Sequence, residues 1–87
     1  MNLVFQIETQ PTAGGDLEIV DVECNPTSDD VSDTLTAEEI AVGSWVLRFV
    51  VNEDFDGNEA VFGKCVRYGL DPTVLHAACA EAAQAEN

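Results

Sequence analysis

Residues 35–51, LTAEEIAVGSWVLRFVV, contain the clearest local signal in this sequence. Thr36 followed three residues later by Glu39 matches the capping box, in which each side chain bonds the other residue's backbone N–H at a helix start. Leu35 and Ile40 occupy the positions of the hydrophobic staple that often accompanies this box. The pattern predicts a helix through AEEIAVGSWVLRFVV. The helix would be apolar on nearly every side, which is typical of a buried, central element.

The second half of this stretch also has a different interpretation. The run SWVLRFVV, residues 44–51, is rich in β-branched and aromatic side chains, which are enriched in strands. Composition therefore leaves a strand open for these eight residues, although the capping box favours the helix.

Towards the N-terminus, the pattern indicates strands. In NLVFQIET the side chains of Leu3, Phe5 and Ile7 alternate with their neighbours, which is typical of a strand with one buried face. QPTAGGD is a turn, and DLEIVDVEC resumes the alternation after a slip that a bulge at Ile19–Val20 would repair. With that bulge, three carboxylates share the polar face. These are Glu18, Asp21 and Glu23. We expect the two strands to form a hairpin with a long connecting loop.

Towards the C-terminus, two more helices are expected. One covers residues 59–68 and is ended by Gly69; the next begins with Asp71 as N-cap and Pro72 at the first helical position. The predicted fold is therefore α+β, with an N-terminal β-hairpin packed on about three C-terminal helices. The 87 residues suit one small domain, residues 1–87.

The N-terminal and hydropathy patterns predict a soluble protein of the cytoplasm. No apolar run approaches the roughly 20 residues of a membrane span. The first residues, MNLVFQIETQ, lack the basic region and the long apolar region of a signal peptide. The 46% of hydrophobic residues is too high for a disordered chain.

The charge is strongly one-sided. The chain has 17 Asp plus Glu against three Lys plus Arg, which gives a net charge of −14. Residues 1–47 contain ten carboxylates and no Lys or Arg. Repulsion among these groups disfavours the compact state, so the pattern is tolerated, useful or an adaptation to high salt.

Catalytic and cofactor motifs are incomplete. The acidic segment NEDFDGNE fits a calcium loop until its last ligand, where Gly63 replaces the required Glu. GNEAVFGKC is one residue too long for a phosphate loop. His76 with Cys24, Cys65 and Cys79 gives the Cys3His set that zinc accepts, but no CxxC pair supports it. We therefore expect no enzyme, metal or cofactor, and buried thiols in a reducing compartment.

Direct binding to nucleic acid is also excluded by charge. Helix, short turn and helix at the C-terminus resemble a helix-turn-helix, but contact with phosphates requires cations that this chain lacks.

The class of partner that remains for the acidic surface is a basic protein. Carboxylates on the outer face of a strand recur about every 6.6 Å, a charge density of the same order as that of DNA. The partner-binding residues predicted on this ground are Glu18, Asp21, Glu23, Asp29, Asp30, Asp33, Asp54 and Asp56, with Phe55 as an apolar anchor.

A very small, strongly acidic α+β chain without a catalytic motif resembles the phage-encoded inhibitors of bacterial defence, notably anti-CRISPR proteins, several of which act as DNA mimics. The likeness covers size, charge and architecture over the whole chain and includes no sequence motif. It implies an inhibitor in the host-cell cytoplasm that binds a CRISPR effector or another defence nuclease. Two alternatives are a halophilic protein of ordinary function and a small interaction module that dimerises through the apolar segment 40–51.

Overall fold

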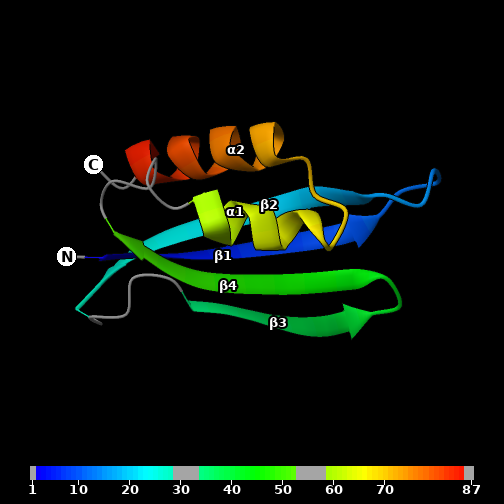
Figure 1. Cartoon of the computed structure of the whole chain (residues 1–87), viewed down its shortest axis with the longest axis horizontal. Coiled ribbons are helices and arrows are strands. Elements are labelled where there is room, and N and C mark those ends of the chain that lie inside the picture. The colour runs from blue at the N-terminus through cyan, green and yellow to red at the C-terminus, as the bar shows by residue number, and fades with distance from the viewer. Residues whose placement is uncertain (1, 29–33, 53–58, 86–87) are drawn as a thin grey trace.

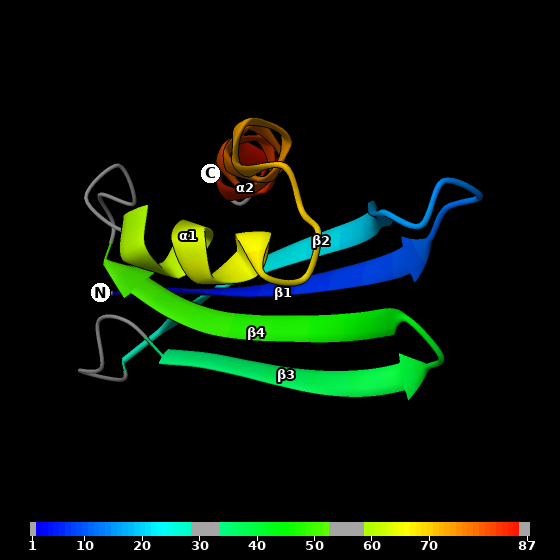
Figure 2. The same cartoon turned by 45° about the vertical axis from the view of Figure 1, so that its right-hand side comes forward.

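The computed structural model describes residues 2–28, 34–52 and 59–85. Within these ranges the chain forms four strands and then two helices. They are β1 Asn2–Pro11, β2 Leu17–Thr27, β3 Thr34–Ala41, β4 Ser44–Asn52, α1 Glu59–Val66 and α2 Pro72–Ala85. The strands form one antiparallel sheet in the order β2-β1-β4-β3. Both helices lie over the same face of this sheet (Figures 1 and 2).

The helix predicted through residues 37–51 is wrong, because this segment forms the hairpin of β3 and β4. Thr36 caps no helix; its hydroxyl instead donates a hydrogen bond of 3.3 Å to the carbonyl oxygen of Arg48 on the neighbouring strand. The staple is wrong too, since Ile40 is 49% exposed. The expected hairpin on about three helices is therefore replaced by a four-stranded sheet with two helices.

Two local features explain why this segment forms strands. Val42 and Gly43 make a two-residue turn, and Gly43 has a φ of 77°, a backbone conformation that side chains disfavour. The run after the turn is β-branched and aromatic, and it pairs with β1 on one side and β3 on the other. Leu47, Phe49 and Val51 become fully buried in this central position.

The N-terminal hairpin is confirmed, and so is its bulge. Glu8 pairs with Asp21 and Thr9 with Ile19, so Val20 is the extra residue. Beyond the bulge the alternation of β2 continues in step with β1. The strand therefore keeps its apolar side chains towards the helices and its carboxylates on the other face.

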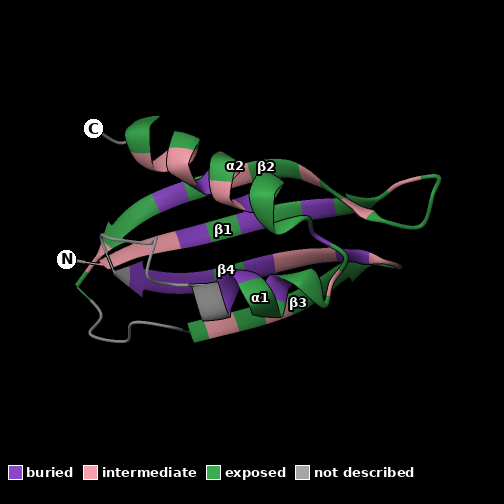
Figure 3. Cartoon of the chain, turned by 45° about the horizontal axis from the view of Figure 1, so that its top comes forward, coloured by how far each residue is buried: buried purple, intermediate pink, exposed green. Residues whose placement is uncertain are grey.

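The core fills the space between the sheet and the helices. The ring of Phe49 stacks on Phe5 at 5.5 Å and meets Phe62 of α1 edge-on at 5.8 Å. From α2, Leu75 and Cys79 are fully buried against these side chains. Figure 3 shows buried positions along β1, β4 and both helices.

The start of α2 follows the sequence prediction, whereas α1 ends at Val66, two residues before the expected Tyr68. The carboxylate of Asp71 accepts a hydrogen bond of 2.9 Å from the backbone N–H of Thr73, as an N-cap does. Gly69 has a φ of 83° in the turn between α1 and α2. The Asp-Pro pair and the glycine before it thus fix where α2 begins.

Candidate protein-binding surface on the open sheet face

One face of the sheet carries no helix in the described part of the chain (Figure 2). Its side chains are those of alternate strand residues that point away from the core, and most of them are polar. The carboxylates among them are Glu8 of β1, Glu18, Asp21 and Glu23 of β2, and Glu38 of β3, all exposed. Arg48 of β4 is the one Lys or Arg that the described strands contain. Five carboxylates against one guanidinium make this face strongly negative.

Four of these carboxylates lie together at the β2 side of the sheet, and we call them the acidic strip. Its members are Glu8, Glu18, Asp21 and Glu23. Glu8 and Asp21 are direct cross-strand partners, so two like charges face each other on one side of the sheet. Like charges directly opposite one another destabilise a sheet.

The rest of the open face separates this strip from the β3 edge. Glu23 is followed across the sheet by Gln6, Arg48 and Thr36, whereas Asp21 is followed by Glu8, Val46 and Glu38. Val4 and Val50 form the next row. Val46, Arg48 and Val50 of β4 therefore lie between the acidic strip and β3, where Glu38 is the one carboxylate on this face.

The structure brings together three of the residues predicted to bind a partner, namely Glu18, Asp21 and Glu23, on one exposed face of β2. The other predicted residues lie outside the described residues. They are Asp29, Asp30, Asp33, Asp54, Phe55 and Asp56.

Sequence reasoning missed Glu8 as a member of this surface. The alternation of NLVFQIET already placed Glu8 on the polar face of its strand. Only the strand register, however, sets it opposite Asp21.

The three cysteines are part of the core. All three lie in the described ranges, are buried and form no disulfide. Burial raises the pKa of the Cys65 thiol to about 11. Burial, and after it the neighbouring Cys65 and Cys24, raise the pKa of Cys79 to about 12. The thiolate is the nucleophilic form, so the Cys65 and Cys79 thiols are inert at neutral pH.

The described residues offer no group of three or more His, Cys, Asp or Glu side chains that could hold a metal ion. His76, which the zinc hypothesis paired with Cys79, packs against the ring of Phe62 at 5.5 Å. This arrangement suits a side chain at the edge of the core better than a ligand.

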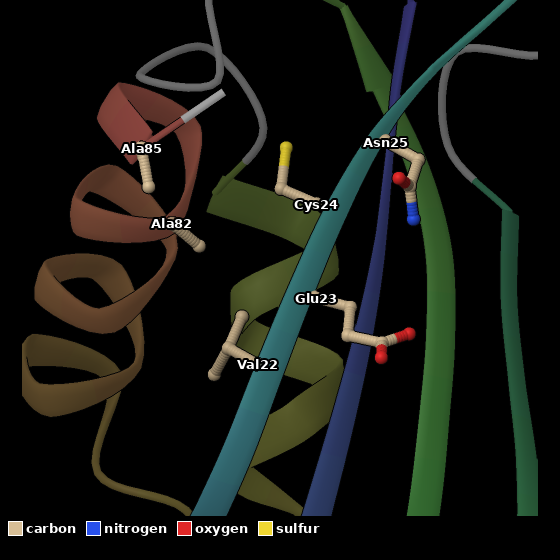
Figure 4. Close-up of a pocket in the computed structure, with 6 residues that line it drawn as sticks. All are labelled: Val22, Glu23, Cys24, Asn25, Ala82 and Ala85. Atoms are coloured by element: carbon tan, nitrogen blue, oxygen red, sulfur yellow. The ribbon is translucent and has the colours of Figure 1, made fainter. Parts of the chain in front are cut away.

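A small hollow of about 300 Å³ lies between β2 and the end of α2 (Figure 4). Val22 and Cys24 point towards the helix layer, whereas Glu23 and Asn25 point to the opposite side of the sheet. Ala82 and Ala85 close the hollow from α2. The carboxylate of Glu23 therefore serves the open face, and the side chains that face the hollow from the helix side of the sheet are Val22 and Cys24.

Neither described helix has the length and apolar character needed to cross a membrane. Searches against protein-family models, curated proteins and solved structures found no match to this chain.

Proposed function

We propose that this chain is a non-catalytic inhibitor that binds a basic nucleic-acid-binding protein through the acidic strip. The target class we propose is a CRISPR effector or another defence nuclease, whose positively charged channel normally holds nucleic acid. The observation that carries the proposal is the grouping of Glu18, Asp21 and Glu23 on one face of β2, with Glu8 opposite Asp21.

The spacing of these charges supports mimicry of a nucleic-acid strand. From Glu18 to Glu23, β2 covers about 16 Å at about 3.3 Å per residue. One DNA strand presents about five phosphates over such a length. Over this length the acidic strip presents three carboxylates along β2 and a fourth, that of Glu8, beside them on β1.

The repulsion between Glu8 and Asp21 supports binding to a cationic surface. The sheet holds these two carboxylates side by side, and no described lysine or arginine is their cross-strand partner. A partner's lysine or arginine placed between them would remove this repulsion. The same negative field would accelerate the encounter with a basic protein.

Dimerisation through segment 40–51 would have to use its first part, where Ile40 and Val42 are exposed. The side chains of Leu47, Phe49 and Val51 in this segment are fully buried, each with an exposed fraction of 0%. They stabilise the fold and are not accessible to a second copy.

Competition with DNA tests the proposal. A purified, guide-loaded CRISPR effector is titrated with labelled duplex DNA that contains its target, with and without this protein. We expect DNA binding to weaken as the protein is added, and the effect to fade as salt rises. An effector that binds both at once, with neither affinity changed, would exclude mimicry for that target.

A further inference from the structure

A groove of about 800 Å³ lies on the helix side of β2, where the strand begins and the turn from α1 to α2 passes over it. Its apolar lining includes Leu17 and Ile19 of β2, Leu70 of the turn, and Val66 and Val74 of the helices. The volume is within the range of about 300–1,000 Å³ that is usual for ligand pockets. It is large enough for more than one apolar side chain.

The two valines that line the groove are unusually exposed to solvent for aliphatic side chains. Val66 is 45% exposed and Val74 is 55% exposed, although the neighbouring Leu70 is almost fully buried at 3%. Leu70 thus belongs to the floor of the groove, and the valines offer apolar surface to whatever enters it. Burying such surface from water contributes about 25 cal/mol per Å².

The groove also has an acidic border. Asp16, Glu18 and Asp71 belong to its lining, and all three are exposed. No lysine or arginine is among the described residues that line it. An apolar groove with carboxylates around it is complementary to an apolar side chain that has basic neighbours.

Glu18 lies at the boundary between the groove and the acidic strip. It is a member of the strip and also a lining residue of the groove, and its carboxylate accepts a hydrogen bond of 3.4 Å from the side chain of Gln10. Because Glu18 and Gln10 are register partners on the open sheet face, this carboxylate lies on the strip side of β2, and the carboxylates left at the groove itself are Asp16 and Asp71.

We propose that this groove binds a short segment of a partner protein in which large apolar side chains are flanked by lysine or arginine. The apolar side chains cover Val66 and Val74, and the basic ones meet Asp16 and Asp71. The site is distinct from the acidic strip, and the inference does not depend on the target class proposed above.

The test uses two acetylated and amidated hexapeptides as probes, Lys-Arg-Leu-Trp-Lys-Arg and Lys-Arg-Ser-Ser-Lys-Arg. They have the same charge, so their difference in affinity isolates the apolar contact from general attraction to a chain of charge −14. Titration calorimetry at about 0.15 M salt gives the affinities, and amide NMR shifts identify the residues that respond. We expect the Leu-Trp peptide to bind at least fivefold more tightly and to shift residues of the groove.

Valine variants with a matched control complete the test. Val74→Gln and Val66→Gln each change an exposed groove side chain, so both should fold normally, and either suffices if the other does not. Val42→Gln is the control, because Val42 is 91% exposed in the β3–β4 turn and does not line the groove. We expect the groove variants to lose the preference for Leu-Trp and the control to keep it.

Equal affinity for the two peptides, or shifts confined to the open sheet face, would overturn the proposal. Because the difference in affinity between the two peptides reports on the groove, failure here would leave the competition with DNA unaffected. Conversely, absence of that competition would not change the result expected with the peptides.

Discussion

The side chain of Thr9 completes the pairing of β1 with β4. The regular register of these strands ends at Glu8 and Val46, and the next residue, Thr9, is 1% exposed. Its hydroxyl donates a hydrogen bond of 2.9 Å to the carbonyl oxygen of Trp45 and accepts one of 3.0 Å from the N–H of the same residue. The hydroxyl of Thr9 thus provides a hydrogen-bond partner for both the N–H and the C=O of Trp45 on the side that faces β1.

We therefore expect Thr9→Val to lower the free energy of unfolding by about 1–3 kcal/mol, because it leaves the partly buried backbone N–H and C=O of Trp45 without their partner on β1. Thr9→Ser keeps the hydroxyl and removes one methyl group, which costs about 1 kcal/mol. Urea unfolding curves of both variants measure the difference. Thr9→Val as stable as the native chain would show that these two hydrogen bonds contribute little.

The buried thiols of Cys65 and Cys79 predict a loss of stability at alkaline pH. Burial raises their pKa values to about 11 and about 12, whereas the ordinary value is 9.0. Between these values the unfolded chain has released protons that the folded chain still holds, so the free energy of unfolding falls as pH rises above about 9. Below that pH the contribution is fully present.

Urea unfolding between pH 7 and pH 10.5 measures this loss. The control is the double variant Cys65→Ala, Cys79→Ala, which is less stable at neutral pH but should lose less stability with rising pH. Parallel pH profiles for the two chains would contradict the assignment to these thiols.

At the scale of elements, the pairing of β1 with β2 carries a cost that can be measured. Glu8 lies directly opposite Asp21, and like charges in this position destabilise a sheet by roughly 0.2–1 kcal/mol. We expect Glu8→Gln to raise the free energy of unfolding by this amount at low salt. Glu38→Gln is the control, since Glu38 lies opposite Val46. If Glu38→Gln raised the free energy of unfolding as much as Glu8→Gln, the gain would come from the lower total charge and not from removal of the Glu8–Asp21 repulsion.

The elements also show which parts of the fold the sequence could predict. The β1–β2 hairpin and the start of α2 were predictable, because alternation, a slip in that alternation, and an Asp-Pro pair are local signals with one physical meaning. The β3–β4 segment was not, because Thr36 and Glu39 satisfy the rule for a helix start while SWVLRFVV suits a strand. Long-range pairing of β4 between β1 and β3 decided the outcome, although Gly43 inside the segment was a warning against a helix.

The candidate site was predictable to a similar extent. Alternation and the bulge correctly placed Glu18, Asp21 and Glu23 on one face. The position of Glu8 opposite Asp21 depends on the register of the hairpin, which no local pattern specifies.

At the scale of the whole molecule, the net charge of −14 raises the question of salt adaptation. The described core contains stacked aromatic rings and fully buried apolar side chains from both layers. We therefore expect the chain to be folded at about 0.15 M salt, where the Debye length is about 8 Å. Circular dichroism at this salt concentration and in 2 M NaCl, both with EDTA, measures whether the chain is folded under each condition. A chain that folds only in molar salt would favour the halophilic alternative.

The central claim is that the position of the acidic strip, beyond total charge, governs binding to a basic partner. The most direct measurement is the association rate with a purified, guide-loaded CRISPR effector, followed by stopped-flow at low salt. Asp21→Asn with Glu23→Gln removes two charges from the strip, and Glu39→Gln with Glu81→Gln removes two exposed charges outside it. Steering depends on where charges lie, so we predict that the strip variant associates at least several-fold more slowly than the matched control. Equal rates for the two variants would contradict the account.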